Sequence, residues 1–189
     1  MLGIHGTSVS ICEIIRSSGF NLSEAGRSGP GIYFWRYFRS ENYAKYLAYK
    51  WWEYCRKKGD YNSLGSNTNC CLITVETDIP DEKILDLSHG ALREDIRELI
   101  NSQLARIRGK TINREAEEVL ISGLYHTYIK AIEQKTGTTF DAIISDVSTP
   151  KGTPGPIGKY FGNCGEALIV LNSTNLKVVR HEKVADYEY

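Results

Sequence analysis

The chain lacks a surplus of charge of either sign, since 23 lysines and arginines balance 23 aspartates and glutamates. Without such a surplus, no global field draws the protein to nucleic acid or anionic lipid, so any such attraction must be local. The sequence also lacks an apolar run near the roughly 18 to 20 residues that a membrane-spanning helix needs. Its first residues do not show the charged and then apolar pattern of a signal peptide. We therefore expect a cytoplasmic protein with no membrane partner.

The cysteines form neither a metal-binding nor a disulfide pattern. There are five, an odd number, and no two are spaced as C-x-x-C, which fits a reducing cytoplasm and predicts no metal site. Four common motifs are also missing: the G-x-x-x-x-G-K-[ST] phosphate loop, G-x-G-x-x-G after a strand, H-E-x-x-H and G-x-S-x-G. Phosphate-loop, Rossmann, zinc-protease and α/β-hydrolase activities therefore have little support.

The length of 189 residues suits one sizeable core and is short for two ordinary domains, so we expect one domain over 1–189. Apolar residues at helical spacing predict four helices, over 10–19, 40–58, 92–107 and 116–127. Ser10 and Glu13 form a capping-box pattern at the start of the first helix, and Gly19 is placed to end it.

Short β-rich runs predict strands between these helices, over 3–7, 31–35, 70–76, 140–145, 166–172 and 176–182. The polar stretch "NSTN" at 172–175 suits a hairpin turn between the last two strands, which indicates an antiparallel sheet. The expected class is therefore α+β, as opposed to a doubly wound parallel sheet. The segment 147–165 has three prolines and five glycines and is long for a loop, which is typical of functional loops.

Three separated stretches combine small residues, a polar or aromatic residue and a strand. They are "GIHGT" at 3–7, "GPGIYFW" at 29–35 with "SENYAKYL" at 40–47, and "GEALIVLN" at 165–172. A strand needs no glycine-proline-glycine entry for packing alone. The three stretches are therefore the candidates for a functional site.

In order and spacing, these stretches resemble the ADP-ribosyltransferase superfamily, in particular the branch of diphtheria toxin and the poly-ADP-ribose polymerases. In that branch a His-Gly-Ser/Thr ends the first strand, G-x-G-I-Y-F carries a tyrosine, S-x-N-Y follows, and a glutamate opens an apolar strand. The matching stretches here begin at His5, Gly29, Ser40 and Glu166. The resemblance implies a split antiparallel β-sandwich core with flanking helices, and the chain adds a helical insertion over about 86–135.

The resemblance further implies that NAD is a co-substrate bound by residues of the first two stretches. The backbone of Gly6, beside Thr7, and the hydroxyl of Ser40 would meet the nicotinamide carboxamide. Tyr33 and Tyr43 would sandwich the nicotinamide ring, whose positive charge favours an aromatic face by roughly 0.5 to 2 kcal/mol. The implied role of these residues is to hold the leaving group.

The implied catalytic residues are Glu166, Tyr33 and His5. Glu166 would hold the 2′-hydroxyl of the nicotinamide ribose and stabilise the cation that develops as nicotinamide leaves, as carboxylates do at glycosidic bonds. His5 would bond to a ribose hydroxyl on the adenosine side. Without a metal, the acceptor would then attack the opposite face of the ribose with inversion.

Each residue also has a plain structural reading. A histidine beside glycine is commonly a strand-end residue bonded to backbone, Tyr33 is an ordinary strand aromatic, and Tyr43 lies on the apolar face of a helix. Glu166 is the hardest to explain in this way, because a carboxylate opening an apolar strand is costly unless it is solvated or paired.

The acceptor is predicted from weaker signals. Residues 36–58 hold seven basic and two acidic residues interleaved with aromatic ones, which suits single-stranded RNA or DNA, although a solvated basic helix end has the same pattern. Cys164 stands two residues before Glu166, where arginine-modifying and guanine-modifying ADP-ribosyltransferases carry Glu or Gln, which argues against both kinds of site by motif. The residues expected to contact the acceptor lie in the preceding loop: Lys151, Lys159, Tyr160, Phe161 and Cys164.

The preferred hypothesis is a mono-ADP-ribosyltransferase that modifies a nucleic-acid base. Small members of the superfamily are often bacterial toxins, which implies a toxin-antitoxin or phage-defence role with an antitoxin protein as a possible partner. A protein acceptor is the first alternative. A non-catalytic NAD-binding or interaction module, with the helical middle as its docking surface, is an alternative of another class.

Overall fold

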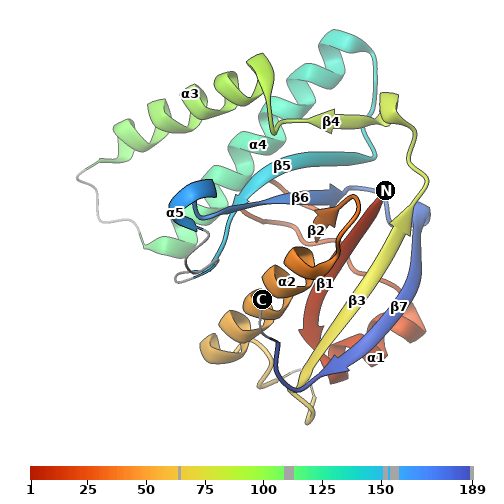
Figure 1. The fold of residues 1–189 in the computed structure, drawn as a ribbon. Helices are drawn as coiled ribbons and strands as arrows, with labels where there is room; N and C mark the ends of the chain where they lie inside the picture. Colours follow the sequence, from red (N-terminus) through yellow and green to blue (C-terminus); the bar gives the residue numbers. More distant parts are fainter. Residues whose placement is uncertain (64, 109–112, 151–152, 154–157, 188–189) are drawn as a thin grey trace.

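The computed structural model describes residues 1–63, 65–108, 113–150, 153 and 158–187. Seven strands form one mixed sheet in the order β4-β5-β6-β2-β1-β3-β7 (Figure 1). The strands are β1 Leu2–Ser8, β2 Ile32–Tyr37, β3 Cys70–Thr77, β4 Ile84–Asp86, β5 Ala142–Ser148, β6 Cys164–Val170 and β7 Leu176–Val184. All neighbours are antiparallel except β4 and β5. The α+β class is confirmed.

Helices cover both faces of this sheet. They are α1 Val9–Ser18, α2 Asn42–Lys58, α3 Gly90–Ile107, α4 Arg114–Thr136 and the single turn α5 Gly158–Phe161. Buried residues of α1 pack with Phe34 of β2, whereas α2 packs with Trp35, the next residue. Because successive strand residues point to opposite faces, α1 and α2 lie on opposite sides of the sheet (Figure 1). No helix among the described residues is long and apolar enough to cross a membrane.

The predicted hairpin between the last two strands is wrong. β6 pairs with β2 and β5, so both of its edges are occupied, and β7 pairs with β3 at the far edge of the sheet. The polar stretch forms a 3₁₀ turn at Ser173–Asn175, in which the Asn172 side chain accepts a hydrogen bond from the Thr174 N–H. This turn redirects the chain to the other edge.

The start of α1 also differs from the prediction. The helix is capped by Ser8, whose Oγ accepts from the Ile11 N–H, and the Oγ of Ser10 instead accepts from the backbone N–H of Asn67. The predicted end is confirmed, because the backbone N–H of Gly19, at φ 79°, bonds to the Ile15 carbonyl. Ser10 therefore ties a loop to the helix and does not form a capping box.

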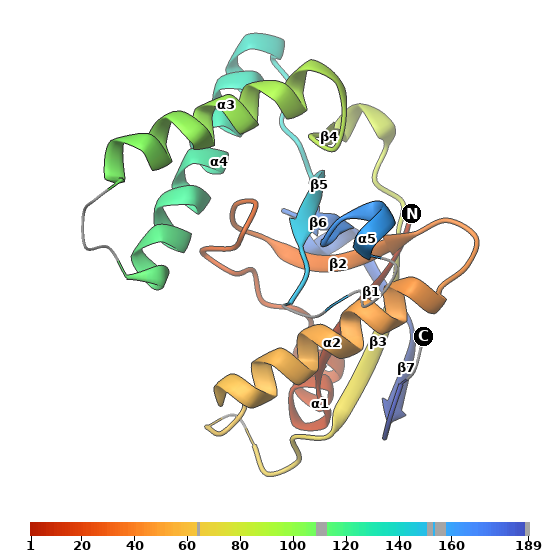
Figure 2. The same cartoon turned by 60° about the vertical axis from the view of Figure 1, so that its left-hand side comes forward.

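The two helices predicted in the middle of the chain are confirmed, and α4 extends well past its predicted end at 127. α3 and α4 pack against each other beyond the β4 edge of the sheet (Figure 2). Tyr125 and Ile129 of α4 are buried in the hydrophobic core against the sheet. The Glu133 carboxylate, near the end of α4, accepts a hydrogen bond from the Phe140 N–H at 3.0 Å. The three-residue strand β4, which precedes α3, was not predicted.

Two glycines allow α2 to lie directly on the sheet. A Cβ at Gly6 would sit 1.9 Å from the Ala48 carbonyl oxygen of α2, and one at Gly165 would sit 2.5 Å from the Leu47 side chain. The Ala48 carbonyl belongs to the helix backbone and cannot move aside as the flexible Leu47 side chain can. The contact at Gly6 is therefore the more restrictive of the two. Gly6 is therefore required by packing, whatever else it binds.

We predict that Gly6→Ala destabilises the protein by about 3 kcal/mol, because the new methyl group overpacks backbone against backbone. Gly123→Ala on α4 is the matched control, since a Cβ there meets nothing within 4 Å. Removing a helix-interior glycine should raise the stability by about 0.5 to 1 kcal/mol. Urea unfolding of both variants measures the difference, and equal stabilities would contradict this packing account.

Candidate functional site

The candidate site lies where β1 and β2 separate. The β1–β2 ladder covers only Leu2 to Ile4 of β1, although β1 continues to Ser8 and stays paired with β3 along its whole length. The first half of β2 pairs instead with β6, on the other side. Past Ile4, the two strands therefore open a gap in the middle of the sheet.

The side chain of His5 bridges this gap. Its Nδ1 lies 2.9 Å from the carbonyl oxygen of Tyr33 on β2. Since a carbonyl only accepts, Nδ1 carries the proton and Nε2 is left as an acceptor in the neutral ring. The bond takes the place of a backbone hydrogen bond that a continuous sheet would make.

Aromatic rings enclose the His5 imidazole. The rings of Phe20 and Phe34 meet it edge-on, with centroids 5.7 and 5.9 Å away. Burial among them lowers the pKa of His5, and the hydrogen bond to the Tyr33 carbonyl opposes this shift without reversing it. His5 is therefore neutral at pH 7 and holds one tautomer.

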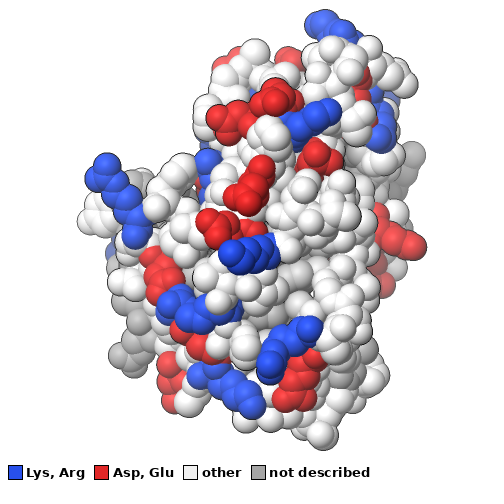
Figure 3. All heavy atoms as spheres, turned by 90° about the vertical axis from the view of Figure 1, so that its right-hand side faces the viewer, with Lys and Arg blue, Asp and Glu red and all other residues white. Residues whose placement is uncertain are grey.

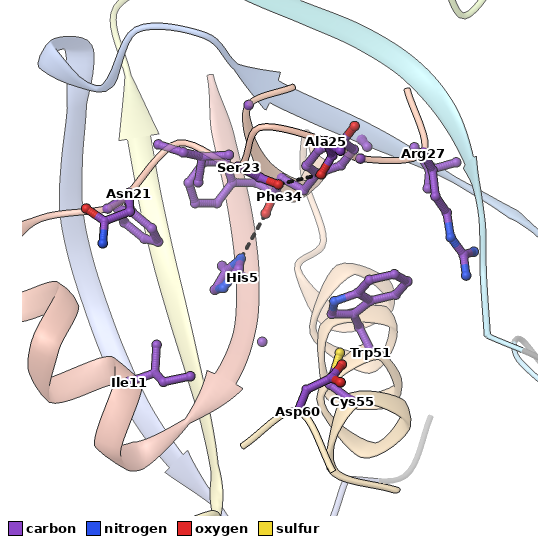
Figure 4. A pocket seen from close by; sticks show the side chains of 18 of the residues that line it. His5, Ile11, Asn21, Ser23, Ala25, Arg27, Phe34, Trp51, Cys55 and Asp60 are labelled. Atoms are coloured by element: carbon purple, nitrogen blue, oxygen red, sulfur yellow. Dashed lines mark hydrogen bonds between the residues drawn. The ribbon is translucent and has the colours of Figure 1, made fainter. Parts of the chain in front are cut away.

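A pocket of about 610 Å³ opens beside this bridge (Figure 4). Its walls come from β1, β2, α1, α2, the loop 19–31 and the first turns of α4. His5, Gly6 and Tyr33 all line it. Two sequence motifs about thirty residues apart thus meet in one cavity.

The hydroxyl of Tyr33 is held by the loop that precedes its own strand. It accepts a hydrogen bond from the Ser28 N–H at 2.9 Å and donates one to the Gly29 carbonyl at 2.5 Å. Burial raises the pKa of Tyr33, so its hydroxyl stays protonated. A Cβ at Gly26 would sit 2.4 Å from this oxygen, and Gly29 and Gly31 have φ of 102° and 140°. The glycines of the motif are thus needed to wrap the loop around the tyrosine.

Glu166 lies on β6 and is not among the residues that line the pocket. Its Oε1 forms an ion pair with Nη1 of Arg36 at 2.8 Å, and about a third of the side chain is exposed. Arg36 and Phe34 share one face of β2, and His5 packs against Phe34. His5 and Glu166 therefore project from the same side of the sheet, and Ala167, next to Glu166, does line the pocket.

The other predicted NAD-binding residues lie outside the pocket lining. Thr7 is buried and shares a side-chain hydrogen bond with Tyr61. Ser40 is exposed just before α2, and Tyr43 is half-buried against the core on the α2 side of the sheet. Three of the predicted residues line the pocket, and these three do not.

The predicted acceptor loop is described only in part. Lys151 and the side chain of Phe161 lie outside the described residues. Lys159 and Tyr160 lie on the short helix α5, with Tyr160 83% exposed, and Cys164 is exposed at the start of β6. These last three side chains are open to solvent.

Most basic residues of the stretch 36–58 are paired with carboxylates. Lys45 contacts both Glu41 and Glu182, and Arg180 also contacts Glu41. Further pairs are Arg36–Glu166, Lys50–Glu53, Lys57–Glu53 and Lys58–Asp60. On the face shown in Figure 3, positive and negative groups are interspersed. The local positive charge expected from the sequence is largely compensated.

Three pocket or site residues were missed by sequence reasoning. Arg27 and Trp51 line the pocket, and Arg36 holds Glu166. The strand register, with Trp35 opposite Ala167, puts Arg36 next to Glu166. A charged residue directly after four apolar strand residues was the available signal for Arg36, but pairing partners cannot be read from the sequence.

No family model, curated protein or solved structure matched this chain. Among the described residues, no three His, Cys, Asp or Glu side chains gather in a way that could hold a metal ion.

We predict that the free energy of unfolding falls as the pH drops through about 6.5, the ordinary histidine value, partly because of His5. Its pKa is lowered in the folded protein, so below that pH the unfolded chain takes up a proton that the folded chain does not. One such group contributes at most about 1.4 kcal/mol per pH unit.

His5→Asn removes this titration and keeps an N–H near the position of Nδ1. Urea unfolding at pH 7.5, 6.5 and 5.5 should therefore show a shallower pH dependence in the variant than in the wild type. Carboxylates contribute equally to the pH dependence of unfolding in both proteins, so their contribution cancels in the difference between variant and wild type. Parallel pH profiles would show that His5 is not held neutral.

Proposed function

We propose that this protein is an NAD-dependent ADP-ribosyltransferase, which cleaves the bond between nicotinamide and ribose and transfers ADP-ribose to an acceptor. The observation that carries the proposal is the meeting of His5, Gly6 and Tyr33 in one pocket where β1 and β2 separate. These are the positions that the motif resemblance assigns to NAD. The function is thus supported both by the order of the motifs and by where the chain brings them.

The pocket residues suit the parts of NAD. Nε2 of His5 is left to accept a hydrogen bond from a ribose hydroxyl, because Nδ1 is used by Tyr33. Tyr33 and Trp51 offer aromatic side chains to planar rings. A cavity of about 610 Å³ falls in the ordinary range for small-molecule and cofactor sites, about 300 to 1,000 Å³.

Glu166 is the proposed catalytic carboxylate. Arg36 engages its Oε1, and the carboxylate has further lone pairs for the 2′-hydroxyl of the nicotinamide ribose. As the glycosidic bond breaks, its electron pair leaves with nicotinamide and positive charge develops on the ribose. The negative carboxylate stabilises that charge, and the acceptor oxygen or nitrogen attacks the opposite face and loses its proton.

A nucleic-acid base remains the proposed acceptor, and the toxin role remains a proposal with it. The support is the set of exposed groups on α5 and the aromatic residues of α2. A protein acceptor is the second candidate, and the ion pairs along α2 favour it. Paired lysines offer less net charge to a phosphate backbone.

We predict that Glu166→Gln lowers the rate of nicotinamide release from NAD by about 100- to 1,000-fold, because a charge-stabilising group is lost. NAD binding should change much less. Glu182→Gln is the matched control, since Glu182 is an ion-paired carboxylate on β7, the far edge strand. Chromatography of released nicotinamide gives the rates, and calorimetry gives the NAD affinity.

One outcome would overturn the enzymatic proposal, and another would overturn the role of Glu166. Binding of NAD without nicotinamide release, with or without cell lysate, would favour the non-catalytic module. Equal activity of the wild type and Glu166→Gln would remove Glu166 from the mechanism. Labelled NAD incubated with lysate then identifies the acceptor: label lost to nuclease marks nucleic acid, and label lost only to protease marks protein.

A further inference from the structure

Arg27 is a charged residue of the pocket wall to which neither the motifs nor the proposed reaction gives a role. It lies in the loop 19–31 and reaches Ser148 at the end of β5, where its Nη1 donates to the backbone carbonyl and to Oγ, both at 2.7 Å. Its guanidinium carbon lies 5.0 Å from the ring centroid of Trp51 on α2. Figure 4 shows Arg27 and Trp51 across the pocket from Ile11 and Asn21.

Arg27 differs from three other cations of the described chain in forming no ion pair, although Glu115 and Glu118 line the same pocket. Arg36, Lys58 and Arg93 contact the carboxylates of Glu166, Asp60 and Asp146, respectively. Within the described part of the chain, Arg27 forms no ion pair, and its two hydrogen bonds reach the neutral oxygens of Ser148. A guanidinium stays charged at any ordinary pH, so it presents a full positive charge at the pocket wall.

The remaining donors of this side chain are suited to an anion. Both bonds to Ser148 use Nη1, whereas a guanidinium has five N–H donors in a planar fork. The contact with the Trp51 ring and the bonds to Ser148 restrain this side chain, which reduces the entropy lost when it binds. A guanidinium held in this way matches the two oxygens of a phosphate group.

We propose that Arg27 binds the pyrophosphate of a dinucleotide in this pocket. The inference rests on the proposed function, because NAD carries two linked phosphates between its riboses. The residues assigned to NAD by the motifs offer backbone, hydroxyls, an imidazole and aromatic rings but no cation. Arg27 supplies the positive charge that this set lacks.

The test compares the binding of ADP-ribose and adenosine by calorimetry. Arg27→Met should weaken ADP-ribose binding by about 10- to 100-fold, the loss expected for charge-assisted hydrogen bonds, and change adenosine binding by less than about twofold. Arg27→Lys should recover part of the affinity. ADP-ribose binding by the wild type, but not by Arg27→Met, should weaken as salt is raised.

Two further variants separate charge from structure. Ser148→Ala loses a tether of the loop but keeps the guanidinium, so it should bind ADP-ribose within about threefold of the wild type. Arg16→Met removes the same charge from the exposed last turn of α1 and should bind as the wild type does. A uniform loss of both ligands in Arg27→Met would show a structural role only and overturn the inference.

The remaining outcomes distinguish this inference from the proposed function. If the wild type and Arg27→Met bind ADP-ribose equally, the pyrophosphate inference fails and the NAD proposal stands. If the wild type binds neither ADP-ribose nor NAD, the proposed function itself fails. If Arg27→Met weakens the binding of a single-stranded RNA oligonucleotide but not of ADP-ribose, Arg27 contacts the acceptor's phosphate and the inference is wrong.

Discussion

The hydrogen bond from His5 to the carbonyl of Tyr33 is the constraint on which the site depends. The two strands that carry these residues pair at only three positions and then separate. A sheet that opens in its middle leaves backbone groups without strand partners, and unpaired buried groups are costly. The imidazole satisfies one of them and fixes its own tautomer in doing so. One side chain thus bridges the gap and presents an acceptor nitrogen beside it.

The surrounding glycines follow from the same geometry. Helix α2 crosses directly over Gly6, close enough that no side chain fits there, and so forms one wall of the pocket. On the other wall, the loop before β2 folds back so that the Tyr33 hydroxyl bonds to Ser28 and Gly29. The glycine-proline-glycine entry to β2 is therefore a turn that wraps a tyrosine. It shapes the pocket wall, of which Gly31 is a part.

The sequence predicted what local patterns determine and missed what depends on strand register. Helices with clear periodicity, such as α2, and apolar strands such as β3 were found nearly in full. The hairpin after β6 was mispredicted because "NSTN" suits a tight turn locally, whereas the occupied edges of β6 exclude one. The motifs identified His5 and Tyr33, but the Arg36–Glu166 pair and Arg27 on Trp51 arise between segments distant in the chain. Such contacts have no period or spacing to detect.

The proposed function requires that NAD bind against His5 in the pocket where β1 and β2 separate. The most direct measurement is nitrogen NMR of the histidine rings, titrated with NAD. We expect free His5 to carry its proton on Nδ1 at pH 7 and its Nε2 resonance to shift to saturation as NAD is added. A proton on Nε2 in the free protein, or an Nε2 resonance that does not move at millimolar NAD, would contradict it.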